Sequence, residues 1–219
     1  MTQYRTTARL VGGLFITATV AALVGGSLLL PIIDPGSADA TAVNEAQIVT
    51  GALIEIVLVL SVVGIAVLLF PVLRQRSEGA ALAYVGSRML EAVLLLTATV
   101  SALVLLTLTL DGTQPGSPIM LAVRDWTYLI GSEFMLGVSA LILYGLLYRA
   151  DLVPAWLSLW GLAGGLLIGL SGVLGMYDLT VPDWVVAVLV APIALNEMVL
   201  ALWLIVRGFN PSALAAARG

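Results

Sequence analysis

Six long apolar runs follow one another along the 219-residue chain, separated by short polar segments. A run of roughly 18 or more apolar residues is long enough to cross a lipid bilayer as an α-helix. The runs are continuous, whereas the strands of a membrane β-barrel would be shorter and would alternate apolar with polar residues. The pattern therefore predicts an all-α fold, a polytopic transmembrane helical bundle that forms one domain over residues 1–219. The expected spans are about 9–30, 48–70, 83–108, 127–147, 155–176 and 184–206.

The basic residues between these spans predict how the chain is oriented. Most of them fall on the side of the two termini, and only Arg124 falls in a loop on the other side. Those on the side of the termini are Arg5, Arg9, Arg74, Arg76, Arg149, Arg207 and Arg218. Because the cytoplasmic loops of membrane proteins are enriched in Lys and Arg, we expect both termini in the cytoplasm.

The N-terminal apolar run has a second interpretation. Arg5 and Arg9 precede it and Ala38-Asp39-Ala40 follows it, as in a secretory signal that is cleaved. The apolar run is longer than the usual ~7–15 residues of such a signal. We therefore predict that the first helix is retained, with cleavage as the alternative.

The composition excludes several kinds of chemistry. Hydrophobic residues make up 61% of the chain and charged residues 10%, and there is no Cys, no His and no Lys. Thiolate and imidazole metal sites, cysteine nucleophiles and lysine Schiff bases are therefore excluded, and we expect no metal, no cofactor and no catalytic residue. The low pI, about 4.6, argues against nucleic acid as a partner. The Arg-only, Ala-rich and Gly-rich composition points to a prokaryote, so the expected location is a prokaryotic inner membrane.

Three separated segments place polar residues inside apolar sequence in a characteristic order. They are PVLRQRSEGAALAYVGSRMLEAV (71–93), LLYRADLVPAWLSLWGLAG (146–164) and NEMVLALWLIVRGFN (196–210). In these segments, and over nearly the whole chain, the sequence resembles the prokaryotic membrane-protein family named domain of unknown function 4386. The resemblance implies the same six-helix fold. It implies no activity and no catalytic residues, so function has to be argued from the residues themselves.

Five ionisable residues fall inside the predicted spans. They are Glu55, Arg88, Glu91, Glu133 and Glu197. Each charge costs about 2.5–3.5 kcal/mol at the centre of a membrane helix, so these side chains should face the bundle interior or a wet cavity. With Arg88 as the only positive charge among them, three negative charges are in excess. We therefore expect some of the carboxyls to be protonated or neutralised by a bound cation.

Spacing and depth predict an inner cluster of polar side chains around Arg88. Glu91 lies three residues after Arg88 and Tyr84 lies four residues before it, so all three share one helix face. Asn196 and Glu197, in the last span, lie deep enough in the membrane to join them. Arg88 would then be the hub of a buried polar cluster.

The remaining carboxyls predict a second, outer group. Glu55 and Glu133 each lie a few residues from the outer end of their span and could meet near the outer leaflet. Together with the inner cluster they would form a ladder of carboxyls across the membrane. Such ladders suit proton relays and cation pathways, although buried carboxyls also join helices by hydrogen bonds alone.

The fifth span contains a stripe of small residues. Gly161, Gly165 and Gly169 recur at every fourth position, which lets two helix backbones approach closely. The stripe predicts close packing within the chain, or alternatively the seam of a homodimer.

Three functions remain open on the sequence alone. The first is a small transporter or a carrier coupled to protons or small cations, which would use the carboxyl ladder within the lipid bilayer. The second is a membrane scaffold that binds a protein partner and whose polar residues only hold helices together. The third, an enzyme acting on lipids, is the weakest, because the sequence contains no paired-Asp motif of the kind that binds diphosphate and magnesium.

Overall fold

The computed structural model of the chain describes residues 2–34, 43–112, 117–177, 179 and 182–216, and in this part it contains helices and no strand. The first three helices are α1 (Thr2–Ile33), α2 (Glu45–Leu73) and α3 (Glu78–Leu110). A composite helix follows, made of α4 (Pro118–Leu129), the π-helical turn η1 (Ile130–Met135) and α5 (Leu136–Arg149). The chain then forms α6 (Ala155–Met176), α7 (Asp183–Val206) and the short α8 (Pro211–Ala216).

Six of these helices, counting the composite helix as one, are long and apolar enough to cross a membrane. The predicted all-α bundle with six spans is therefore confirmed, and its apolar helices imply a lipid environment. A bilayer favours this architecture because a helix satisfies its backbone hydrogen bonds within one segment. The candidate cleavage stretch Ala38-Asp39-Ala40 and Arg218 lie outside the described residues.

The fourth span differs from its prediction. The composite helix begins at Pro118 and not near residue 127, so Arg124 lies inside the span and not in a loop. Arg124 is also buried. The prediction that Arg124 lies in an outer loop is therefore wrong.

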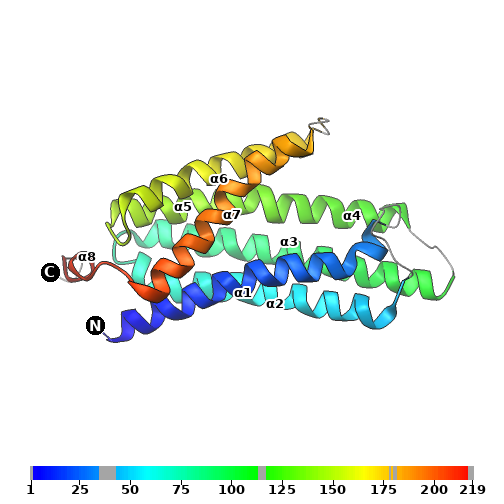
Figure 1. The fold of residues 1–219 in the computed structure, drawn as a ribbon, viewed down its shortest axis with the longest axis horizontal. Coiled ribbons are helices and arrows are strands. Elements are labelled where there is room, and N and C mark those ends of the chain that lie inside the picture. Colours follow the sequence, from blue (N-terminus) through cyan, green and yellow to red (C-terminus); the bar gives the residue numbers. More distant parts are fainter. Residues whose placement is uncertain (1, 35–42, 113–116, 178, 180–181, 217–219) are drawn as a thin grey trace.

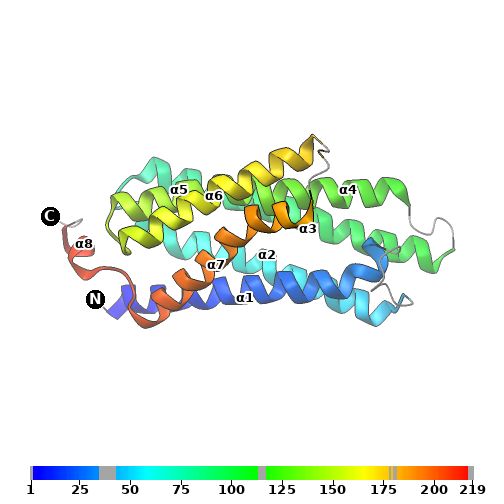
Figure 2. The ribbon, with the colours of Figure 1, turned by 45° about the horizontal axis from the view of Figure 1, so that its top comes forward.

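Both termini lie at one end of the bundle, which we call the terminal end, and we call the other end the distal end (Figure 1). Helices α1, α2 and α3 pack side by side, and α5, α6 and α7 form a second group. Helix α7 joins the two groups, because it runs obliquely from α6 at the distal end to α1 at the terminal end, as Figure 2 shows from a second direction.

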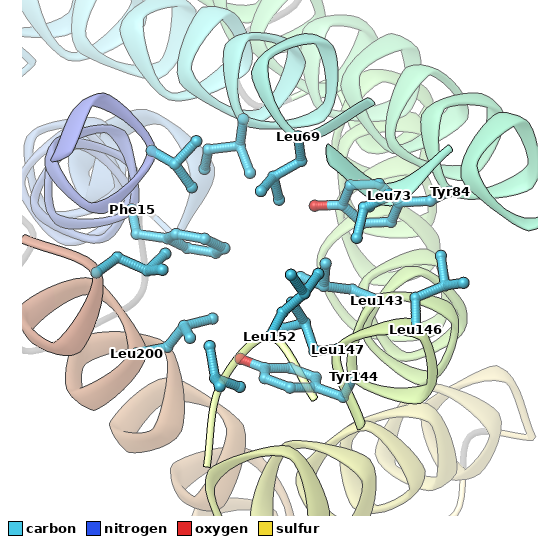
Figure 3. Packing of buried hydrophobic residues seen from close by; sticks show 14 of the residues in the cluster. Phe15, Leu69, Leu73, Tyr84, Leu143, Tyr144, Leu146, Leu147, Leu152 and Leu200 are labelled. Atoms are coloured by element: carbon cyan, nitrogen blue, oxygen red, sulfur yellow. The ribbon is translucent and has the colours of Figure 1, made fainter. Parts of the chain in front are cut away.

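The terminal half of the bundle is filled by apolar side chains. Figure 3 shows this layer, in which Phe15, Leu73 and Leu200 come from three different helices. Two phenol groups belong to the same layer, and the hydroxyls of Tyr84 and Tyr144 point toward the middle of the bundle. Because lipid tails are as apolar as these side chains, close packing and not water exclusion holds such a layer together.

The glycine stripe of α6 packs against α5 inside the chain. A Cβ atom on Gly161 would overlap the ring of Tyr144, and one on Gly137 would come within 2.9 Å of the Gly165 oxygen and 2.8 Å of the Gly169 Cα. The two backbones can lie this close only because these positions lack side chains. The stripe therefore serves packing within the chain, and the structure gives no support to a homodimer through it.

Candidate functional site

A cavity of about 340 Å3 lies between α1, α2, α3, the composite helix α4–η1–α5, α6 and α7. Its wall is mostly apolar, but four charged side chains line it: Arg88, Glu91, Glu133 and Glu197. We call it the central cavity. It brings together charges from three separate spans at a depth where each charge is costly unless it is paired.

Arg88 is the centre of the charged group, as the sequence analysis expected. Its Nη1 donates to both carboxylate oxygens of Glu91, at 2.8 and 3.0 Å, and both residues are almost fully buried. Its Nε donates to the Tyr84 hydroxyl at 3.3 Å, and Ser139 from α5 donates to Glu91 at 3.4 Å. The pair is local to α3, because residues three apart on a helix lie on one face.

Glu197 is the most loosely held member of this group. Its Oε1 lies 3.5 Å from Arg88 Nη2, at the limit of a hydrogen bond, whereas the bonds to Glu91 are short. Its side chain is 15% exposed, against 4% for Glu91. Glu197 is therefore the carboxylate that a ligand in the cavity can reach with the smallest loss of protein contacts.

Glu133 lies on the π-helical turn between α4 and α5. Its Oε2 is buried and has no hydrogen-bond partner among the described residues. The turn packs closely against α6, since a Cβ on Gly172 would come within 2.9 Å of the Phe134 nitrogen. Short π-helical turns inside α-helices are rare and often occur at functional sites. Here the turn places an unpartnered carboxylate oxygen in the membrane interior.

A second cavity, of about 460 Å3, lies on the distal side of the central one. Tyr128 and Glu133 line both cavities and so form the partition between them. Toward the terminal end, by contrast, the apolar layer of Figure 3 closes the bundle. The charged group therefore has a further cavity on its distal side and packed apolar side chains on its terminal side.

A separate buried ion pair joins α2 to α4. Arg124 binds Glu55 with two bonds, Nη2 to Oε1 at 2.6 Å and Nη1 to Oε2 at 3.1 Å. Thr99 donates to the same carboxylate at 2.7 Å, and Arg124 also donates to the Ala98 carbonyl at 2.9 Å. A Cβ on Gly25 would lie 3.0 Å from Glu55 Cγ, so α1 covers the pair closely. With both carboxylate oxygens bound, this pair is closed.

This pair changes the charge balance predicted from the sequence. Arg88 is not the only positive charge in the membrane interior, because Arg124 is a second one. Glu55 therefore pairs with Arg124 and does not form an outer group with Glu133. Adding Arg124 to the five ionisable residues expected inside the spans reduces their excess from three negative charges to two.

Asn196 turns away from the cluster around Arg88. Its Nδ2 donates to the Leu157 carbonyl of α6 at 3.0 Å, while its Oδ1 has no partner among the described residues. The hydroxyls of Tyr144 and Ser158 are likewise buried and unpartnered there. Asn196 thus fixes α7 to α6, and Glu197 beside it is free to face Arg88.

Metal ligation has little support in this geometry. No group of three or more His, Cys, Asp or Glu side chains within the described ranges could hold a metal ion. The charged groups of the central cavity are instead arranged around a guanidinium, which is the partner of Glu91.

A family model, described as a domain of unknown function (DUF4386), matches residues 10–208. The chain belongs to the DUF4386 family. The match covers most of the first span and all of the other five in this DUF4386 chain, including Arg88, Arg124 and the four intramembrane glutamates. Comparisons with curated proteins and with solved structures gave no match. Since the family brings no established activity, the function is argued from the site.

Two sequence signals could have located Arg124. The apolar stretch Ile119-Met120-Leu121-Ala122-Val123 directly precedes it, which favours a helix that starts earlier. The expected excess of three negative charges was itself a sign that a cation was missing.

We predict that Arg124→Gln destabilises the fold far more than Arg124→Gln combined with Glu55→Gln. The single change leaves a buried carboxylate without its partner, at a cost of roughly 3–5 kcal/mol, whereas the double change leaves no charge to compensate. Thermal unfolding in lipid nanodiscs measures the difference. Arg149→Gln, at an exposed position of the terminal end, is the control and should change little. If the single and double variants lose the same amount of thermal stability, the pair is not closed.

Proposed function

We propose that this DUF4386 chain is a small carrier coupled to protons or cations, with the central cavity as its binding site. The observation that supports it best is the cavity wall, where one guanidinium shares the cavity with three carboxyls. These carboxyls differ in how many hydrogen bonds hold them and in how short those bonds are. Glu91 is held tightly, Glu197 loosely, and Glu133 has an oxygen without a partner. A wall of this kind can exchange the partner of Glu197 while Arg88 stays compensated by Glu91.

The exchange follows from the distances around Arg88. A cation that enters the cavity can replace Arg88 as the partner of Glu197, because that contact is already at its limit of 3.5 Å. Arg88 keeps Glu91 and the Tyr84 hydroxyl, so its own charge stays compensated. When the cation leaves, a proton on Glu197 can take its place. Cation and proton would therefore compete for one carboxyl, which is the basis of coupled transport.

The scaffold remains the alternative, and one observation favours it. The Arg124–Glu55 pair joins two helices, and its carboxylate oxygens are both occupied, so it has a purely structural arrangement. Arg88 also joins α3 to α7 through Glu197. If all the buried charges act in this way, the chain binds no ion and its role is to present a surface to a partner.

We also propose that the termini are cytoplasmic and that the chain lies in a prokaryotic cell membrane. With Arg124 and Arg88 inside the bundle, each remaining described Arg lies at the terminal end. These are Arg5, Arg9, Arg74, Arg76, Arg149 and Arg207. Among the described residues, every Arg outside the bundle interior therefore lies at the terminal end and none at the distal end. This distribution strengthens the argument from the positive-inside rule.

The proposed orientation is tested with single cysteines, because the chain has none of its own. We predict that a membrane-impermeant maleimide applied to intact cells labels Asp111→Cys at the distal end. Ser212→Cys in α8 should react only after the cells are opened. Both positions are exposed. The opposite labelling pattern would reverse the orientation.

We predict that Glu197→Gln abolishes coupling while the protein still folds. In proteoliposomes with a trapped pH dye, a tetramethylammonium gradient should drive proton counterflow through the unmodified chain and at least about tenfold less through the variant. Glu78→Gln, at an exposed position of the terminal end, is the matched control and should keep the flux. Thermal unfolding checks that both variants fold.

Two results would decide against the carrier. Flux that is unchanged in Glu197→Gln removes Glu197 from the mechanism. No flux in the unmodified chain, together with a lower unfolding temperature for Glu197→Gln, is the result that the scaffold predicts.

A further inference from the structure

Helices α1 and α7 are in close contact near the terminal end. A Cβ on Gly12 would lie 2.5 Å from the Ala201 oxygen and 2.8 Å from Ile205 Cγ1. Only glycine at position 12 permits this approach, so the two helices pack closely where they cross.

Beyond this crossing the two helices follow different neighbours. Helix α1 stays on α2, where a Cβ on Gly51 would lie 3.0 Å from Leu28 Cβ. Helix α7 instead lies on α6, where a Cβ on Gly164 would come within 2.9 Å of the Ile193 nitrogen. Figures 1 and 2 both show α7 diverging from α1 toward the distal end. The two helices therefore form a V that is closed at the terminal end.

The central cavity reaches the surface in the opening of this V. Thr19, Ala22 and Leu23 of α1 and Ala194 of α7 line the cavity. Leu23 is 70% exposed and Ala194 is also exposed, although both line the wall, so they form its rim. Both lie within the membrane-spanning parts of their helices. An apolar rim at this depth faces acyl chains and not water.

The inner end of the cavity is charged, whereas the rim is apolar. Arg88, Glu91, Glu133 and Glu197 contribute one positive and three negative formal charges, so the group favours a cation. The volume, about 340 Å3, lies at the small end of ligand pockets and is too small for a whole membrane lipid. A ligand with a small cationic head fits the inner end, and an attached chain would pass through the rim into the bilayer.

We propose that the central cavity takes single-chain cationic amphiphiles directly from the bilayer, through the opening between α1 and α7. The cationic head binds at Glu197, and the alkyl chain lies over Leu23 and Ala194. The inference rests on the proposed function for the role of Glu197, and it adds the substrate class and the route of entry.

The test compares a ligand that has a chain with one that has only the head. Radiolabelled decyltrimethylammonium and tetramethylammonium are bound to the full chain in lipid nanodiscs. We predict that Ala194→Trp, which fills the rim, weakens binding of the decyl compound at least about tenfold and leaves tetramethylammonium unchanged. Leu23→Trp, on the other side of the rim, should act in the same way. Ala163→Trp, at an exposed position of α6 that does not line the central cavity, is the matched control.

Glu197→Gln separates this inference from the proposed function. It should weaken binding of both compounds, because both present the same cationic head. If Glu197→Gln has this effect but both rim variants bind the decyl compound like Ala163→Trp, the route through the bilayer is wrong and the carboxylate site stands. If Glu197→Gln changes neither compound, the proposed site and this inference both fail. A loss of both compounds in folded rim variants would also overturn the route, since the head alone should still enter.

Discussion

A charge inside a bilayer has to find its compensation within the same protein, and the interior of this bundle is organised by that requirement. Among the described residues, Arg124 and Arg88 are the two buried cations, and each is held by a carboxylate within hydrogen-bond distance. The surroundings follow from these contacts. Gly25 lets α1 cover Glu55, and the composite helix must begin early enough to bring Arg124 to α2. An uncompensated charge at either position would cost several kcal/mol, which a helix bundle of this size can ill tolerate.

The two buried arginines nevertheless differ in whether a carboxylate beside them can still bind a ligand. Arg124 and Glu55 bind each other with two bonds and Thr99 donates a third to the carboxylate, so both oxygens of Glu55 are occupied. Arg88 satisfies Glu91 fully but reaches Glu197 only at 3.5 Å, beside a cavity. The difference between a closed pair and an open group is the physical ground on which we propose a structural role for one and a binding role for the other. It also explains why a carrier and a scaffold are each supported by part of the molecule.

Much of the fold could be predicted because the membrane allows few solutions. The apolar run 155–176 coincides with α6, and the i, i+3 spacing of Arg88 and Glu91 was sufficient to pair them. Arg124 was misplaced because two adjacent charged residues, Arg124 and Asp125, lower the local hydropathy and obscure the start of the helix before them. The π-helical turn at Glu133 leaves no mark in the apolar pattern, since it depends on how the turn packs against Gly172. The direction of the Asn196 side chain likewise depends on a backbone oxygen of another helix.

The most direct measurement is the reaction of the intact protein in lipid with an apolar carbodiimide, followed by peptide mass spectrometry. Such a reagent modifies carboxyls that can be protonated and that it can reach from an apolar phase. The account predicts modification of Glu197, in the open group, and protection of Glu55, which Arg124 and Thr99 enclose. Modification of Glu55 to the same extent as Glu197, or protection of both, would contradict the distinction between a closed pair and an open group.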